Sequence, residues 1–207
     1  MLQKWQKTSS ANLAEVYESE KQFNAAEREL ETAIANEPDP ELRARLLIDL
    51  LRVELSAGND AKAEAVFNKA RQIADENGLT DVIVDIHIHV ADHEWQGDQG
   101  SKINATKAYL VAVVQALSKQ NLTPIPKVFG HVVLQLTNAH HAPSEPEFDL
   151  LLEIVRSELP APTNRNRKAL EFVLWPFETA RRLLPLVGDQ ERFSSELEKA
   201  TRNGVFG

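Results

Sequence analysis

The sequence predicts an all-α fold, an α-solenoid of about five antiparallel helix pairs. Two observations support this prediction. Good helix formers such as Ala, Leu, Glu and Lys fill most of the 207 residues, and only 8 residues are Gly. A trio of residues at steps of four and three, which places all three on one face of a helix, also recurs along the chain.

The recurring trio marks the second helix of each expected pair. Its five copies are Ala26, Leu30, Ala33; Ala63, Phe67, Ala70; Ala105, Tyr109, Ala112; Phe148, Leu152, Val155; and Phe193, Leu197, Ala200. Successive copies are about 37 to 45 residues apart, a spacing typical of helical repeats. Turns that contain Gly precede the second, third and fifth copies, and Gly permits the left-handed cap that ends a helix.

Pro and Gly residues between the trios mark the ends of the expected helices. The expected pairs are 3–19 with 22–36, 40–57 with 60–76, 80–96 with 103–119, 125–139 with 145–158, and 164–183 with 189–203. Pro176 lies inside one of these helices, where we expect a kink or a helix start. The segment Asp81–Val90 alternates apolar and polar residues, as a strand does. We expect a helix there, because a lone strand in a helical stack would have no partner.

The run from residue 10 to residue 38 has the most complete repeat pattern. Small residues would let two antiparallel helices approach closely, and larger residues would fill the space beside them. The residues that form this pattern are Leu13, Ala14, Tyr17, Ala26, Leu30, Ala33 and Pro38. The run resembles a tetratricopeptide repeat, except that Ser10 holds the place of the large aromatic residue that opens the family pattern.

The resemblance extends over residues 1–207 as a single helical-repeat domain. The repeats are clearest at 7–40 and 44–77 and degenerate at 80–120, 125–159 and 164–203. Their steps exceed the standard length of about 34 residues, which indicates longer helices or loops. The resemblance implies a superhelix whose concave groove, lined by the first helix of each pair, binds a partner peptide or protein.

Alignment of the expected first helices places a set of mostly polar residues near this groove. They are Asn12, Glu15, Asp49, Arg52, His87, Glu94, Thr137 and Arg182. Their mixed charges indicate a polar, peptide-like ligand. Family members that bind the carboxylate terminus of chaperones use Lys and Asn at set groove positions. Asn12 fits one of them, but Thr8 and Asp49 replace the Lys and the second Asn, so we do not expect a chaperone tail.

A histidine cluster at residues 87–93 has two interpretations. On a helix, His89 and His93 share a face with Asp85 one turn earlier, which would form half of a zinc site. Alternatively, His89 lies in a helix interface while its neighbours face solvent or the groove. We favour the second interpretation and expect no metal and no other cofactor. Asp85, His89 and His93 are the residues to test if a metal is bound.

Neither sequence motifs nor composition indicate an enzyme. The chain has no G-x-S-x-G elbow, no Walker loop, no G-x-G-x-x-G and no Cys. His140 and His141, with His131 nine residues before, are expected to be structural, because adjacent residues on a helix point in different directions. The alternative is a loop that brings these histidines together. The formal net charge of -8 disfavours direct binding of nucleic acid.

Apolar stretches are short. The N-terminal residues have no apolar region typical of a secretory signal, and Ala108–Leu117 is about half as long as a membrane helix. We therefore expect a cytoplasmic protein with no membrane partner. The alternative is a mature exported protein from which the signal has been removed. Of the three Trp residues, Trp5 is expected at the end of the stack or on a contact surface, Trp95 partly exposed, and Trp175 in the core.

Basic residues gather in the last repeat, at Arg165, Arg167, Lys168, Arg181 and Arg182. Guanidinium groups suit carboxylate or phosphate ligands, so an acidic peptide could dock there. The alternative is a solvated helix face, which we favour for any one of these residues.

Three hypotheses of function follow. The favoured one is a non-catalytic scaffold or adaptor that binds a partner peptide or protein in its groove. The second is a ligand-sensing regulatory module of a transcriptional or signalling complex, because repeats of about 40 residues resemble those of bacterial transcriptional regulators. The third is a metal-dependent enzyme built on the cluster at 87–93. The sequence leaves open whether the chain forms a homo-oligomer or belongs to a larger complex.

Overall fold

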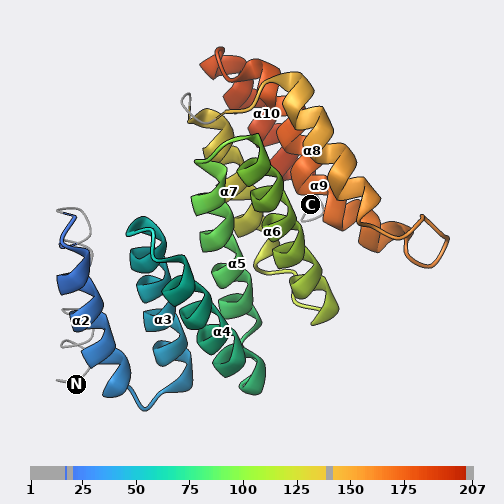
Figure 1. The fold of residues 1–207 in the computed structure, drawn as a ribbon. Coiled ribbons are helices and arrows are strands. Elements are labelled where there is room, and N and C mark those ends of the chain that lie inside the picture. Colours follow the sequence, from blue (N-terminus) through green and yellow to red (C-terminus); the bar gives the residue numbers. More distant parts are fainter. Residues whose placement is uncertain (1–16, 18–20, 139–141, 204–207) are drawn as a thin grey trace. The chain divides into compact units, whose positions relative to one another are not determined.

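The computed structural model describes residue 17, residues 21–138 and residues 142–203 (Figure 1). Every regular element in these residues is a helix, so the predicted all-α class is confirmed. The expected helix 3–19 lies, apart from Tyr17, outside the described residues, as do Trp5, Asn12 and Glu15. The chain divides into two compact units, residues 1–90 and 91–207.

The first unit contains α2 (Phe23–Ala35), α3 (Pro40–Ser56), α4 (Asp60–Glu76) and most of α5 (Thr80–Trp95). The helix α3 packs against both α2 and α4 (Figure 1). Asp39 begins α3, because its carboxylate accepts hydrogen bonds from the backbone N–H groups of Glu41, at 2.9 Å, and Leu42. Gly58 and Gly78 follow α3 and α4 with φ of +73° and +67°, a conformation that Gly adopts without a Cβ clash.

The second unit contains the end of α5 and five further α-helices. They are α6 (Gln99–Ser118), α7 (Ile125–Thr137), α8 (Glu145–Ser157), α9 (Arg167–Leu183) and α10 (Gln190–Asn203), with the short 3-10 helix η1 (Leu184–Leu186) before the last. Packing joins α6 to α7, α8 to α9 and α9 to α10, and it also joins α6 to α8 and α7 to α9. The helix α6 also contacts α9, so packing in this unit joins helices one, two and three apart along the chain.

The recurring trios lie on the buried faces of α2, α4, α6, α8 and α10. All their residues are buried except Ala33, Phe67 and Leu197, which are half-buried. Steps of four and three therefore identified the core face of every second helix. The small members Ala26, Ala70 and Ala105 are fully buried, which lets neighbouring helices approach closely.

The segment 81–90 is helical, as expected from its context. Its strand-like alternation has a physical reason, because the helix is buried on several sides. The residues of α5 that are at most 2% exposed include Val82, Ile83, Val84, Ile86 and Ile88. Successive residues of a helix point in different directions, so α5 is covered on more than one face. A helix buried in this way lacks the single apolar stripe of a surface helix, and its periodicity is hard to recognise.

Three local expectations need correction. The helix α9 continues through Pro176, so a helix start near that residue is wrong. Trp95 is 1% exposed and not partly exposed, because its ring packs against Tyr109 with centroids 6.1 Å apart. Trp175 is half-buried and contacts Phe129, with ring centroids 4.7 Å apart.

None of the described helices combines the length and the apolar character needed to cross a membrane.

Candidate functional site

The most distinctive polar feature of the second unit is a hydrogen-bonded cluster centred on Asp92. Asp92 lies near the end of α5, Tyr109 is the middle residue of the trio on α6, and His131 and Gln135 are one turn apart on α7. Three helices thus bring four side chains to one point. We call these four residues the Asp92 cluster.

The carboxylate of Asp92 accepts three hydrogen bonds. Its Oδ1 accepts from the Tyr109 hydroxyl and from Nε2 of Gln135 at 3.0 Å, and its Oδ2 lies 2.7 Å from Nδ1 of His131. Tyr109 is fully buried and Gln135 is 6% exposed, whereas the side chains of Asp92 and His131 are 23% and 27% exposed. The base of the cluster is therefore in the core, and the imidazole reaches the surface.

The cluster fixes the protonation of its two acidic members. Burial opposes the ionisation of Asp92, but the hydrogen bonds from His131, Tyr109 and Gln135 outweigh burial and hold the pKa of this carboxyl below its usual value. Burial and the Asp92 charge raise the pKa of the Tyr109 hydroxyl. At neutral pH, Asp92 is thus ionised and Tyr109 keeps its proton.

An ionised Asp92 also sets the tautomer of His131. A carboxylate only accepts hydrogen bonds, so Nδ1 of His131 carries the hydrogen that lies between them. In the neutral ring, Nε2 is then the acceptor nitrogen. A histidine held by a carboxylate in this way is suited to accept or donate one directed hydrogen bond, or to bind a metal through Nε2.

The residues that the sequence singled out for a metal site differ in their surroundings. Across the described parts of the chain, no three His, Cys, Asp or Glu side chains lie close enough together to hold a metal ion. Asp85, one of the three residues singled out for such a site, is buried and lies 3.5 Å from the Arg45 guanidinium. His89 is half-buried and His93 is exposed.

One face of α7 is open next to the Asp92 cluster. Leu134 is 60% exposed, more than any other large hydrophobic residue in the described parts of the chain. Residues three or four apart on a helix are neighbours, so Leu134 shares this face with His131. The face, here called the α7 surface, is formed by exposed or half-exposed residues: Lys127, Gly130, His131, Leu134 and Thr137.

The predicted groove residues lie in both units and differ in how far they are exposed. In the first unit, Asp49 and Arg52 on α3 are half-buried. In the second unit, Glu94 is half-buried, Arg182 is exposed, and Thr137 lies on the α7 surface.

His87 differs from the position assigned to it by the alignment of first helices. It is 8% exposed, and its ring meets Phe67 edge-on with centroids 5.5 Å apart. Its Nε2 is buried and has no hydrogen-bond partner among the described residues. Burial, with a smaller contribution from Arg71, lowers the pKa of His87 to about 4. His87 is thus a neutral core residue and not part of an accessible groove.

Sequence reasoning missed the Asp92 cluster. Asp92 belongs to the histidine cluster at residues 87–93 but had no role of its own there, and His131 was grouped with His140 and His141, which lie outside the described residues. One signal was available. Tyr109 occupies a core position of its trio, and a buried hydroxyl requires a hydrogen-bond partner.

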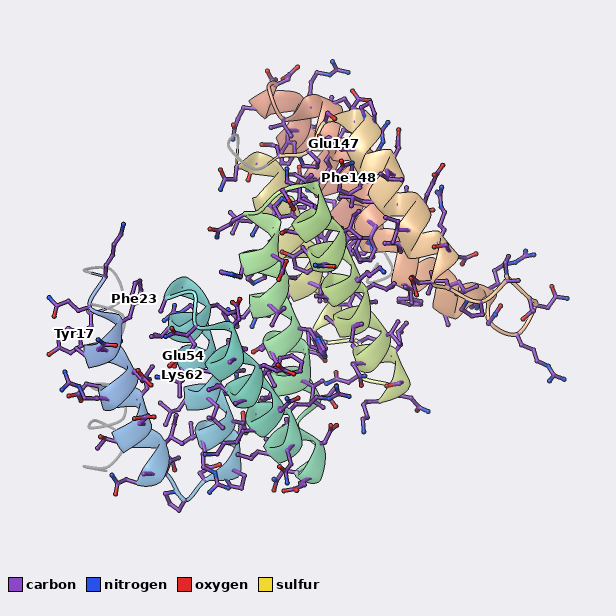
Figure 2. All side chains as sticks on the ribbon, in the orientation of Figure 1. Tyr17, Phe23, Glu54, Lys62, Glu147 and Phe148 are labelled. Carbon is purple, nitrogen blue, oxygen red and sulfur yellow. The ribbon has the colours of Figure 1, made fainter. Side chains whose placement is uncertain are left out.

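A second buried polar group lies in the first unit. Glu54 of α3 is 2% exposed and accepts a hydrogen bond of 2.7 Å from Nδ2 of Asn59. Burial raises its pKa. Lys62 of α4 lies near it and pairs with Glu27 of α2 (Figure 2). These contacts join α2, α3 and α4, which indicates a structural role.

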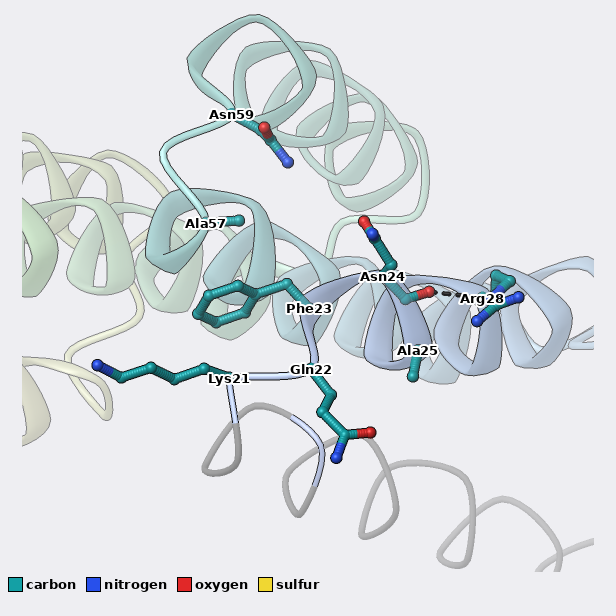
Figure 3. A pocket seen from close by; sticks show the side chains of 8 residues that line it. All are labelled: Lys21, Gln22, Phe23, Asn24, Ala25, Arg28, Ala57 and Asn59. Atoms are coloured by element: carbon teal, nitrogen blue, oxygen red, sulfur yellow. Dashed lines mark hydrogen bonds between the residues drawn. The ribbon is translucent and has the colours of Figure 1, made fainter.

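Open pockets occur in both units. One, of about 430 Å³, lies at the start of α2 and is lined by Lys21, Gln22, Phe23, Asn24, Ala25, Arg28, Ala57 and Asn59 (Figure 3). Its Arg28 is turned along α2, because Nε donates to the Asn24 carbonyl at 3.1 Å. A smaller pocket in the second unit, of about 320 Å³, is lined by His93, Glu94, Gln96, Gly97 and Ser101.

A further pocket, of about 470 Å³, lies in the second unit where α9, η1 and α10 meet. We call it the α9–α10 pocket, and its lining residues are Arg182, Leu186, Glu191, Arg192, Ser195, Glu196 and Lys199. It contains Arg182, one of the residues that the sequence assigned to partner binding.

Comparisons with known proteins give no relative from which a function of these sites could be inferred. No family model, no curated protein and no solved structure matches the chain. The residues and their geometry are therefore the basis on which a function can be assigned.

Proposed function

We propose that the chain is a non-catalytic helical-repeat protein of tetratricopeptide type, which holds a partner peptide or protein against the α7 surface. The observation that supports this most directly is Leu134. It is 60% exposed and lies one turn from a histidine whose ring is fixed by a carboxylate. An exposed apolar side chain next to a directed polar group is the usual composition of a contact surface.

The properties of the Asp92 cluster favour binding of a partner over catalysis. Asp92 already accepts three hydrogen bonds and has a lowered pKa, so it is a weak base. The raised pKa of Tyr109 makes its hydroxyl a poor proton donor at neutral pH. The cluster instead prevents rotation of His131, and a fixed side chain loses less conformational entropy when a partner binds.

The packing of the helices supports the same proposal. The contacts of α6 with α8 and of α7 with α9 join helices two apart in the chain, as stacked helix pairs would. Stacks of helix pairs bind partners along the surface formed by like helices. The partner proposed here offers an apolar side chain to Leu134 and a hydrogen-bonding group to Nε2 of His131.

The proposal is tested by affinity capture with Leu134→Glu and His131→Ala. The control is Leu150→Glu, which changes a leucine of α8 that is 41% exposed. A partner that copurifies with the wild type should be retained by the control, lost with Leu134→Glu and weakened about tenfold or more with His131→Ala. Equal retention by all variants, with circular dichroism showing an intact fold, would rule out the α7 surface.

One observation favours the second candidate function, a ligand-sensing module. The α9–α10 pocket has the size of a small-molecule site and is rich in cationic side chains. Its lining shares no residue with the α7 surface, so the two functions can be tested separately.

A further inference from the structure

The α9–α10 pocket has an unusual charge for this chain. Its lining includes three cationic residues, Arg182, Arg192 and Lys199, and two acidic residues, Glu191 and Glu196. The chain as a whole has a formal net charge of -8. A local excess of cations in an acidic protein needs a specific explanation.

Two of the five charges neutralise each other. Nζ of Lys199 lies 2.6 Å from Oε1 of Glu196, one turn away on α10. Lys199, with smaller contributions from Arg182 and Arg192, lowers the pKa of Glu196, so this carboxylate stays ionised. The remaining charges are two guanidinium groups against the single carboxylate of Glu191.

Arg182 donates a hydrogen bond to a hydroxyl group. Its Nη2 lies 3.3 Å from the hydroxyl of Thr179, a residue of α9 that is 1% exposed. The neighbouring Arg181 differs, because it pairs with both Asp149 and Glu145. Among the described residues, no carboxylate lies within ion-pair distance of Arg182. The hydrogen bond to Thr179 engages one nitrogen of the guanidinium group and leaves most of its five N–H donors for another group.

Arg192 is also weakly engaged. Its Nε lies 3.9 Å from Oδ2 of Asp189, at the limit of an ion pair, and its side chain is 73% exposed. The Oδ1 of the same Asp189 accepts from the backbone N–H of Arg192, as a helix cap does. Asp189 therefore serves the start of α10 more than it serves the guanidinium.

We propose that the α9–α10 pocket binds a small anionic molecule, whose phosphate or carboxylate group is held between the guanidinium groups of Arg182 and Arg192. The hydroxyl of Ser195 donates a further hydrogen bond. Leu186, which is half-buried against the core of this unit, covers an adjoining apolar part of the ligand. Guanidinium groups bind such oxyanions through paired, charge-assisted hydrogen bonds.

The test is a titration of the full chain with inorganic phosphate and, in a separate arm, with citrate, at low and constant ionic strength. Calorimetry measures affinity, and amide shifts of Ser195 locate the site. At least one anion should bind saturably in the millimolar range or tighter, and the arm that binds more tightly identifies phosphate or carboxylate as the preferred group. Arg182→Gln should weaken binding about tenfold, and Arg182→Gln with Arg192→Gln should abolish it.

The matched control is Arg202→Gln, on the same helix as Arg192. Arg202 is outside the pocket lining and pairs with Glu198. This variant should bind as the wild type does. The proposal fails if neither anion binds saturably up to about 50 mM, roughly the weakest range in which site binding is measurable. It also fails if the double variant, with an unchanged circular dichroism spectrum, binds like the wild type or if Arg202→Gln loses binding equally.

Discussion

Tyr109 is the residue that links the core of the second unit to its surface histidine. Its ring lies in the core beside Trp95, and its hydroxyl reaches Asp92. Because Asp92 also holds His131, the position of a surface imidazole depends on a hydroxyl that is fully buried. A polar atom at a core position is costly unless it is hydrogen-bonded, and here the bond orients a surface group.

Tyr109→Phe should therefore destabilise the protein by about 2 kcal/mol, since a partly buried carboxylate loses one of its three donors. Urea unfolding at pH 7 measures this free energy. Tyr17→Phe is the control, because Tyr17 is the other tyrosine of the chain and is half-buried among apolar residues. Equal stability of Tyr109→Phe and the wild type would contradict the role given to the hydroxyl.

His87 makes the stability of the first unit depend on pH. Its pKa is lowered to about 4 in the folded chain, against 6.5 for an ordinary histidine. Between these two values the unfolded chain binds the proton and the folded chain does not, so stability falls as pH falls from 6.5 to 4. The loss should total about 3 kcal/mol.

His87→Phe should remove this part of the pH dependence, because phenylalanine keeps the contact with Phe67 and does not titrate. The measurement is urea unfolding at several values between about pH 7 and pH 4. His93→Phe, at an exposed position of the same helix, should keep the slope of the wild type. A His87→Phe protein with an unchanged slope would show that burial of His87 is not its source.

At the scale of elements, helix ends were easier to predict than helix contacts. The observed helices begin and end within about four residues of the expected ones, a usual error for such boundaries. The signals at helix ends are local: Pro40 opens α3, Gly58 and Gly78 follow α3 and α4, and Asp98 caps α6. The cap at Asp98 also explains why α6 begins at Gln99 and not at residue 103, since its Oδ1 accepts from the Ser101 N–H at 2.9 Å.

A capping box starts α8. Ser144 and Glu147 form a reciprocal capping box, in which the Glu147 carboxylate accepts from the Ser144 N–H at 2.7 Å. Ser144→Ala should cost about 1 kcal/mol in urea unfolding. Ser157→Ala, which removes a hydroxyl at the other end of α8, should cost less than half as much. A larger loss from Ser157→Ala would contradict this account of α8.

At the scale of the whole molecule, the contacts divide the chain between residues 90 and 91, inside α5. The first unit has a core of its own, built from residues such as Leu30, Leu47 and Leu51. The second contains a core around Phe129 and Leu183. The trio pattern crosses this division unchanged, because it reports only which face of each helix is buried. A single repeat domain over residues 1–207 stays a prediction.

Charge is also a property of the whole molecule. The net charge of -8 repels anions at long range, whereas the α9–α10 pocket attracts them at contact distance. At an ionic strength of about 0.1 M, salt screens the long-range repulsion beyond about 10 Å. Added salt therefore weakens both the repulsion of anions by the chain and their binding in the pocket. Anion titrations of this chain therefore require constant ionic strength.

The sequence by itself determined the helical class, the approximate ends of the helices and the buried faces of the second helices. These features depend on residues within one or two turns of each other, and local periodicity and capping report them directly. The apolar residues of α5 also indicated burial, although they suggested a strand when considered alone.

Only the tertiary structure decided which polar residues meet. Asp92 and His131 are 39 residues apart in sequence, and their contact requires α5, α6 and α7 to converge. The burial of His87 and Trp95 likewise depends on the helices packed over them. Local patterns indicate which face of a helix is apolar. They do not specify which neighbouring helix covers that face or at which turn the two helices meet. Those choices come from packing, which acts between residues that are distant in the chain.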